Sequence, residues 1–257
     1  SSLGGAGTST LAVAFGGNTP TRTDATEEWA FSGLDPSTTP AADYADAIVG
    51  DFYYNSTTGQ FKNNVAGTGT WASGTNTPGN KSLFATAGTR DTTYLFAGGD
   101  APGVNDSTIL YDGTSWSEQA ELNLDRSGAS GFGTSTAAVC TGGYDETSPG
   151  FKADTEEWDG SSWTEVTDSP QAALNSGAAG SQTAGLQFGG GDNPGITANT
   201  KTYDGTNWTE VNNLNTAKRR SMGYCIGTQT ASLMVAGESS TATLAEVESW
   251  DGTSWTE

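Results

Sequence analysis

The sequence predicts an all-β fold, a single β-propeller of about five four-stranded blades, on three observations. One eight-residue phrase recurs with small changes, as YDGTSWSE, WDGSSWTE, YDGTNWTE and WDGTSWTE. Its inner tryptophan recurs every 45 to 47 residues, and a further step back reaches a tryptophan without the Asp-Gly pair, which gives Trp71, Trp116, Trp163, Trp208 and Trp255. Each unit also contains an apolar run that ends in small residues, mostly paired glycines. Short strands repeated with a period of about 46 residues are typical of propellers.

Each unit predicts its strands in a fixed order. A strand of small residues and a short turn precede the apolar run, which is LAVAFGG, YLFAGG, AAVCTGG, AGLQFGG or ASLMVAG. A variable loop and a third strand follow. The Asp-Gly turn then leads into a fourth strand that begins at the tryptophan, because Asp-Gly between two strand-like runs is a strong hairpin signal. The predicted blades are about 1–73, 74–118, 119–165, 166–210 and 211–257.

The first unit departs from this pattern by an insertion at about 32–69. Within it, DFYYNSTTGQFKNN predicts strand, turn and strand, with STTG as the turn. This hairpin belongs either to the outer edge of the first blade or to a flap beside it. Five blades are enough for a narrow ring, which we expect to be closed.

Composition and charge exclude several classes of function. The chain has 257 residues with a net charge of −20, and it contains 36 Gly and 0 His. Such a charge repels phosphates and anionic membrane surfaces, so no nucleic acid partner is expected, and no apolar run is long enough for membrane insertion. The lack of histidine removes the usual serine and cysteine triads and the His-rich metal sites. Cys140 and Cys225 are expected to be free and buried.

Two recurring features favour structure over chemistry. The tryptophans occur once per unit at the same place, so we expect blade packing rather than a sugar-stacking platform. The acid pairs Glu27-Glu28 and Glu156-Glu157 precede the blade aromatic at the same place in two units. We interpret them as part of the repeat, and we assign no catalytic residue.

The unit resembles the kelch repeat, in which a strand ends in Gly-Gly, an aromatic follows and a tryptophan begins the outer strand. The matching residues are Gly98-Gly99, Tyr111 and Trp116; Gly142-Gly143, Trp158 and Trp163; Gly189-Gly190, Tyr203 and Trp208; and Ala236-Gly237, Trp250 and Trp255. Phrases such as EEWDGSSWTEV, NNLNTAKR and GDFYYNSTTGQFK are similar to kelch-like arrays in tail fibres and other structural proteins of tailed, especially marine, bacteriophages. The resemblance implies a virion-surface location and a role in structure or host attachment.

The loop after the glycine pair is where a ligand is expected to bind. It differs among units while the framework repeats, as NTPTRTD, DAPGVND, YDETSPGFKAD, GDNPGITAN and ESSTATLAE. Variable loops on a constant scaffold suit recognition, although loops also vary where nothing constrains them. The candidate ligand-binding residues are Asp100, Asp106, Tyr144, Asp145, Glu146, Asp192 and Asn193. Such side chains could bind sugar hydroxyls or Ca²⁺, but no loop matches an EF-hand, so no metal ligand or cofactor is assigned.

The links between units, LNLDRSG and LNTAKRRS, are expected on the opposite face. Their basic run Lys218-Arg219-Arg220 is the best candidate for an anionic partner, with a solvated turn as the default interpretation. The preferred hypothesis is a non-enzymatic virion module that binds a host-surface glycan or protein. Other virion proteins and copies of the same chain are further expected partners. The alternatives are a glycan-active enzyme on the same scaffold and a purely architectural decoration protein.

Overall fold

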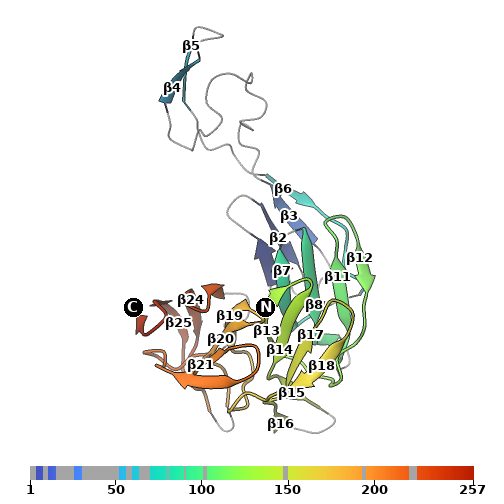
Figure 1. The fold of residues 1–257 in the computed structure, drawn as a ribbon, viewed down its shortest axis with the longest axis vertical. Helices are drawn as coiled ribbons and strands as arrows, with labels where there is room; N and C mark the ends of the chain where they lie inside the picture. The colour runs from blue at the N-terminus through green and yellow to red at the C-terminus, as the bar shows by residue number, and fades with distance from the viewer. Residues whose placement is uncertain are drawn as a thin grey trace.

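All regular structure in the described residues is β-strand, arranged in antiparallel sheets. The structure is a computed structural model that describes residues 4–7, 11–15, 26–30, 52–55, 60–63, 70–79, 81–89, 91–100, 103–146, 150–192, 195–219 and 225–257. The side chains up to residue 72 and those of residues 99, 100, 103 and 104 lie outside this description. Four-stranded sheets surround a common centre (Figure 1). This arrangement confirms the all-β class and the β-propeller.

Four blades follow one another from residue 85 onward, numbered two to five after the predicted units. Blade two contains β7 (Ala85–Thr89), β8 (Thr92–Phe96), β11 (Thr108–Tyr111) and β12 (Trp116–Glu118). Blade three contains β13 (Ser130–Thr134), β14 (Ala137–Thr141), β17 (Thr155–Trp158) and β18 (Trp163–Val166). Blade four contains β19 (Gly177–Ser181), β20 (Ala184–Phe188), β21 (Thr200–Tyr203) and β22 (Trp208–Val211). Blade five contains β23 (Cys225–Thr228), β24 (Ala231–Glu238), β25 (Thr243–Trp250) and β26 (Trp255–Thr256).

The number of blades differs from the prediction, because the structure shows four packed blades where the sequence predicts five. The remaining four-stranded sheet, here called the first sheet, comes from the unit predicted as blade one. It pairs in the same order and contains β1 (Gly4–Gly7), β2 (Leu11–Phe15), β3 (Thr26–Ala30) and β6 (Thr70–Ser73). Its side chains lie outside the described residues, so no side-chain packing defines it as a fifth blade.

Three two-stranded ribbons complete the described structure. The predicted hairpin of the insertion is confirmed, because β4 (Phe52–Asn55) pairs with β5 (Gln60–Asn63) around the STTG turn. This ribbon is a sheet of its own, so it is not the outer hairpin of the first sheet. The other two ribbons follow glycine pairs and consist of β9 (Gly99–Asp100) with β10 (Gly103–Val104), and β15 (Tyr144–Asp145) with β16 (Gly150–Phe151).

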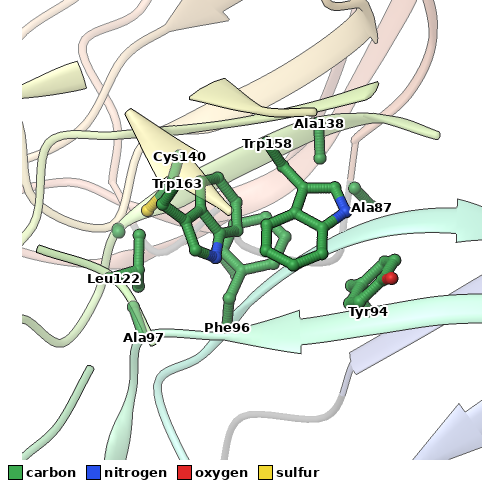
Figure 2. Close-up of a cluster of buried hydrophobic side chains, with 11 residues drawn as sticks. Ala87, Tyr94, Phe96, Ala97, Leu122, Ala138, Cys140, Trp158 and Trp163 are labelled. Carbon is green, nitrogen blue, oxygen red and sulfur yellow. The ribbon is translucent and has the colours of Figure 1, made fainter. Parts of the chain in front are cut away.

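Blades two, three and four each pack one face against the aromatic residues of the next blade. Tyr94 and Phe96 of β8 point toward Trp158 and Trp163 of blade three, with ring centroids 5.3 and 4.8 Å apart (Figure 2). Phe188 of blade four packs in the same way on Trp255 of blade five, at 4.7 Å. Tilted and edge-to-face pairs of this kind contribute about 0.5–1.5 kcal/mol each beyond the burial of their surface. The interpretation of the tryptophans as packing residues is thereby confirmed for Trp163 and Trp255, which are buried.

Some of these tryptophans also make a hydrogen bond across the interface between blades. The indole Nε1 of Trp163 donates to Thr108 Oγ1 of the preceding blade at 2.9 Å. The indole Nε1 of Trp255 donates to Thr200 Oγ1 at the same distance. A buried indole needs an acceptor, because an unpaired polar group in the core costs about 1–3 kcal/mol. The threonine that begins the third strand therefore helps to position the next blade.

The recurring DG-x-x turn is fixed by its aspartate. In blade two, Asp112 Oδ1 accepts the backbone N–H groups of Thr114 and Ser115 at 2.9 and 2.8 Å. The glycine after the aspartate has φ of 90°, a backbone conformation that side chains disfavour. The same bonds hold the turns that begin at Asp159, Asp204 and Asp251. This geometry explains why the phrase is repeated: it is the outer hairpin of each blade.

Blade five leaves one apolar face exposed. Its exposed side chains are Ile226, Leu233, Val235 and Val247, with relative exposures of 66, 38, 37 and 44 %. The residues at the same register in blade four as Leu233 and Val235 are Leu186 and Phe188, which are fully buried. The structure thus leaves uncovered a face that a closed ring would bury.

Candidate recognition face

The variable loops and the links between blades lie at the same end of the strands. The sequence-based expectation that the links lie on the opposite face is wrong. In an antiparallel sheet of four strands in sequence order, the connection from strand two to strand three and the exit from strand four fall at one end. Hydrogen bonds show this directly: Ser127, in the link to blade three, exchanges two backbone bonds with Tyr144, in the loop of blade three. We call this end the recognition face.

The glycine pair ties each loop to the link that follows. The N–H groups of Gly98, Gly143 and Gly190 donate to Arg126, Ala173 and Lys218 carbonyls at 2.7, 2.8 and 2.8 Å. The loop can therefore vary while its starting point stays fixed. Gly143 and Gly190 have φ of 105° and 106°, and a Cβ on Gly190 would come within 2.9 Å of Ser176 Cβ. Glycine is required there for backbone conformation and for space.

Three carboxylates gather on the recognition face where blades two and three meet. Asp106 lies in the loop of blade two, Asp145 in the loop of blade three and Asp125 in the link between them. Desolvation, and then the negative charges of Asp106 and Asp145, raise the pKa of Asp125 above its usual value. The three groups are therefore close enough to interact. Sequence reasoning proposed Asp106 and Asp145 but missed Asp125, because it placed the link on the wrong face.

The candidate residues in the loops of blades two and three differ in their surroundings. Asp145 is buried and pairs with Lys152 Nζ at 3.4 Å, so it supports the ribbon rather than standing free. Tyr144 is partly buried, and its ring packs edge-to-face on Phe151. Glu146 is exposed. Asp100 belongs to β9 and pairs in register with Gly103.

Asp192 lies apart from this group, in a polar network of blade four. Its Oδ2 accepts a hydrogen bond from Gln171 Nε2 at 2.7 Å, and the Gln171 carbonyl accepts one from Lys201 Nζ at 3.2 Å. Burial lowers the pKa of Lys201 to about 8, against the opposing charges of Glu210 and Asp192. Asn193 lies outside the described residues. The carboxylate of Asp192 is thus hydrogen-bonded within the protein.

Two residues of the basic run, Lys218 and Arg219, pair with carboxylates of blade five and do not form the anion-binding patch that the sequence suggested. Lys218 is fully buried, and its Nζ lies 2.8 Å from Glu248 Oε1. Arg219 lies 3.6 Å from Glu238 and exchanges two backbone bonds with it. A buried ammonium group must be paired with a carboxylate, because its desolvation costs several kcal/mol as an order of magnitude. The attraction within the ion pair offsets this cost. Lys218 and Arg219 therefore anchor the link in blade five, while Arg220 lies outside the described residues.

The acid pair in blade three is also structural, as its recurrence indicates. Glu156 is buried and forms an ion pair with Arg126, while Glu157 Oε1 accepts a hydrogen bond from Tyr203 Oη at 2.8 Å. Neither cysteine of the chain, Cys140 or Cys225, forms a disulfide bond. Cys140 is fully buried, and that burial raises its pKa to about 12, whereas Cys225 is only partly buried.

Taken together, the fold and this face define a β-propeller with a constant framework and one variable end. No family model matches the chain, and no curated protein matches it. Within the described ranges, no cluster of acidic and cysteine side chains has the geometry of a metal site. A search of those same ranges also finds no helix long and apolar enough to cross a membrane.

Proposed function

We propose that the chain is a non-enzymatic recognition module on the surface of a virus particle, and that its recognition face binds a glycan or protein of the host surface. The observation that carries the proposal is the contrast on that face: constant hydrogen bonds from the glycine pairs hold loops whose residues differ from blade to blade. Binding residues are commonly found on loops held by a rigid scaffold. The virion location rests on the sequence resemblance to phage tail-fibre arrays alone.

The ligand we propose is rich in hydroxyl or amide groups and not anionic. The chain carries a net charge of −20, and on this face the negative charge of Asp106 acts on the carboxyl group of Asp125. Carboxylates accept hydrogen bonds from sugar hydroxyls and repel acidic polymers. We further propose that the first sheet is the first of five blades, because its strand order is that of the other four.

The test is binding of the purified chain to a panel of bacterial surface polysaccharides and to whole cells, with calcium and with chelator. Replacing the loop 144–154 by the corresponding loop of blade four should abolish or redirect binding and leave the unfolding transition cooperative. Asp106→Asn and Asp125→Asn should weaken it. The matched control is Asp204→Asn, which makes the same charge change in a turn at the other end of the strands. Binding that survives the loop replacement and both substitutions would contradict this assignment of the face.

A second candidate, a glycan-active enzyme, is favoured by one observation. Asp125 is a carboxyl group whose pKa is raised beside the carboxylates of Asp106 and Asp145, which is the arrangement that separates an acid from a base in glycoside hydrolysis. Release of reducing sugar from a bound polysaccharide that is lost in Asp125→Asn, with binding retained, would support the enzyme. Binding without release would support the recognition module.

A further inference from the structure

We propose that the first sheet of the same chain packs on the exposed apolar face of blade five. The propeller would then close as a ring, with Trp29 and Trp71 of the first sheet facing blade five. This inference concerns the ring and is independent of what the recognition face binds. Its starting point is the set of exposed side chains on β23, β24 and β25, which are Ile226, Leu233, Val235 and Val247. They are the exposed large apolar residues of the part of the chain whose side chains are described.

The position of these residues in the repeat specifies what should cover them. Register aligns Leu233 and Val235 with Tyr94 and Phe96 of blade two, through the pairings within each sheet. Tyr94 and Phe96 are buried by Trp158 and Trp163 of the next blade. The face therefore corresponds to a surface that, elsewhere in the molecule, receives a pair of aromatic residues from strands three and four.

Blade four provides a second instance of the same rule. Its Leu186 and Phe188 cluster with Met234, Trp250 and Trp255 of blade five. Ala178 and Val139 belong to a further such cluster, in which Phe132 of blade three meets the aromatics of blade four. Every interface between consecutive packed blades thus has an apolar second strand on one side and an aromatic pair on the other.

The first sheet carries an aromatic pair at the matching register, and no blade precedes it in the described chain. Trp29 pairs across the strands with Trp71, as Trp158 pairs with Trp163. Ala12 pairs with Trp29, as Ala138 pairs with Trp158. The first strands of consecutive sheets contact one another: β1 contacts β7, β7 contacts β13, and β13 contacts β19. One end of the array therefore has a vacant apolar surface and the other an aromatic pair of the type that fits it.

The same chain is the favoured source of the covering blade because its two ends are tethered. A tether raises the effective concentration of one end at the other to about the millimolar range, well above the working concentration of a purified protein. In a ring of five places, a second copy placed by the same repeat operation would have to fit its first sheet where the first sheet of the first copy lies. Closure within one chain avoids this conflict.

The test uses cysteine protection in the full chain with Cys225→Ala. Leu233→Cys measures the accessibility of the face that the first sheet is proposed to cover. Leu186→Cys lies in the covered interface between blades four and five, and Ser240→Cys lies on an exposed surface. Maleimide labelling of Leu233→Cys should match Leu186→Cys and be at least about tenfold slower than Ser240→Cys. The double substitution Trp29→Ala and Trp71→Ala should then expose Leu233→Cys and leave Leu186→Cys protected.

Several results would overturn the proposal. The first is labelling of Leu233→Cys as fast as Ser240→Cys. The second is protection that persists without the two tryptophans. The third is protection that disappears on dilution together with a dimeric mass by native mass spectrometry, which would assign the face to a second copy. If the double substitution unfolds the chain, exposing Leu186→Cys as well, the dilution series and the mass still decide between one chain and two.

Discussion

Blades three and four carry opposite charges at one buried position, and the difference shows how the repeat tolerates change. In blade three the second residue of the third strand is Glu156, which pairs with Arg126 and accepts hydrogen bonds from the backbone and side chain of Asn123 at 2.8 Å. In blade four the same position holds Lys201. The charge at this position is reversed between the two blades.

The residues that surround this position differ between the two blades as well. The residue that corresponds to Arg126 in the link before blade four is Ala173, since each stands four residues before the first strand of its blade. Lys201 instead donates to the carbonyl of Gln171 and to Gln187 Oε1, at 3.2 and 3.4 Å. The buried group and its partners therefore change together, because a charge left without them is costly.

Breaking the pair of blade three should have the largest effect. We expect Arg126→Met to destabilise the chain by about 3–5 kcal/mol, because Glu156 is left buried and uncompensated. The measurement is the urea midpoint at constant m-value. The double variant Arg126→Met with Glu156→Leu should recover most of the loss, and a double variant as unstable as the single one would show that the pair is not the cause.

Removing the charge of blade four should change the pH dependence of stability. Burial lowers the pKa of Lys201 to about 8 from its usual 10.5, so the folded state disfavours the charged amine. The unfolded chain binds the extra proton between these two values, so stability rises with pH across that window. Lys201→Met should therefore flatten this part of the profile, because the variant has no amine to titrate at this position.

The profile is measured by denaturant unfolding between pH 7 and about 10.5, with wild type and variant compared at each pH. Since other lysines and tyrosines also titrate there, the difference between the two proteins is the quantity that matters. A difference that stays constant over the range would contradict the assignment to Lys201.

The packing between blades gives a smaller test. Thr200→Val keeps the shape of the side chain and removes the acceptor for Trp255 Nε1, so we expect a loss of about 1 kcal/mol. Thr209→Val makes the same chemical change at an exposed position of the same blade and should be near neutral. Equal effects of the two substitutions would show that the indole bond contributes nothing.

The turns should give the smallest effect, and there blades three and four should behave alike. Hydrogen bonds from the following residues lower the pKa of Asp159 and of Asp204 below the usual 3.8. The stability from each group is present above 3.8 and is lost as pH falls through the lowered pKa. Asp159→Asn and Asp204→Asn should each remove a small part of the acid dependence of unfolding below pH 4, and unequal effects would contradict the shared turn geometry.

The sequence predicted the parts of the fold that repeat. The period of the tryptophans and the glycine pairs gave the strands, their order and the outer hairpins, because each of these has a local chemical cause. The end of the propeller at which the links between blades lie was predicted wrongly. It follows from the antiparallel path of the whole blade and not from any short sequence motif. Lys218 appeared to be a surface charge for a similar reason: its partner Glu248 lies thirty residues further along, in a different strand.

The candidate site was predicted only in part. Asp106 and Asp145 came from the variable loops, and the structure brings them together with Asp125. Asp192 came from the same reasoning but belongs to a network that includes Gln171. Loop position alone cannot separate these cases, because the partners of each carboxylate come from the neighbouring link.

The indole bonds between blades have a consequence for the way the chain folds. Trp163 reaches Thr108, and Trp255 reaches Thr200, across a sequence separation of 55 residues in both cases. Each blade can therefore complete its neighbour as soon as one more unit has been synthesised, and the propeller can grow from its N-terminal side in steps of nearly constant contact order.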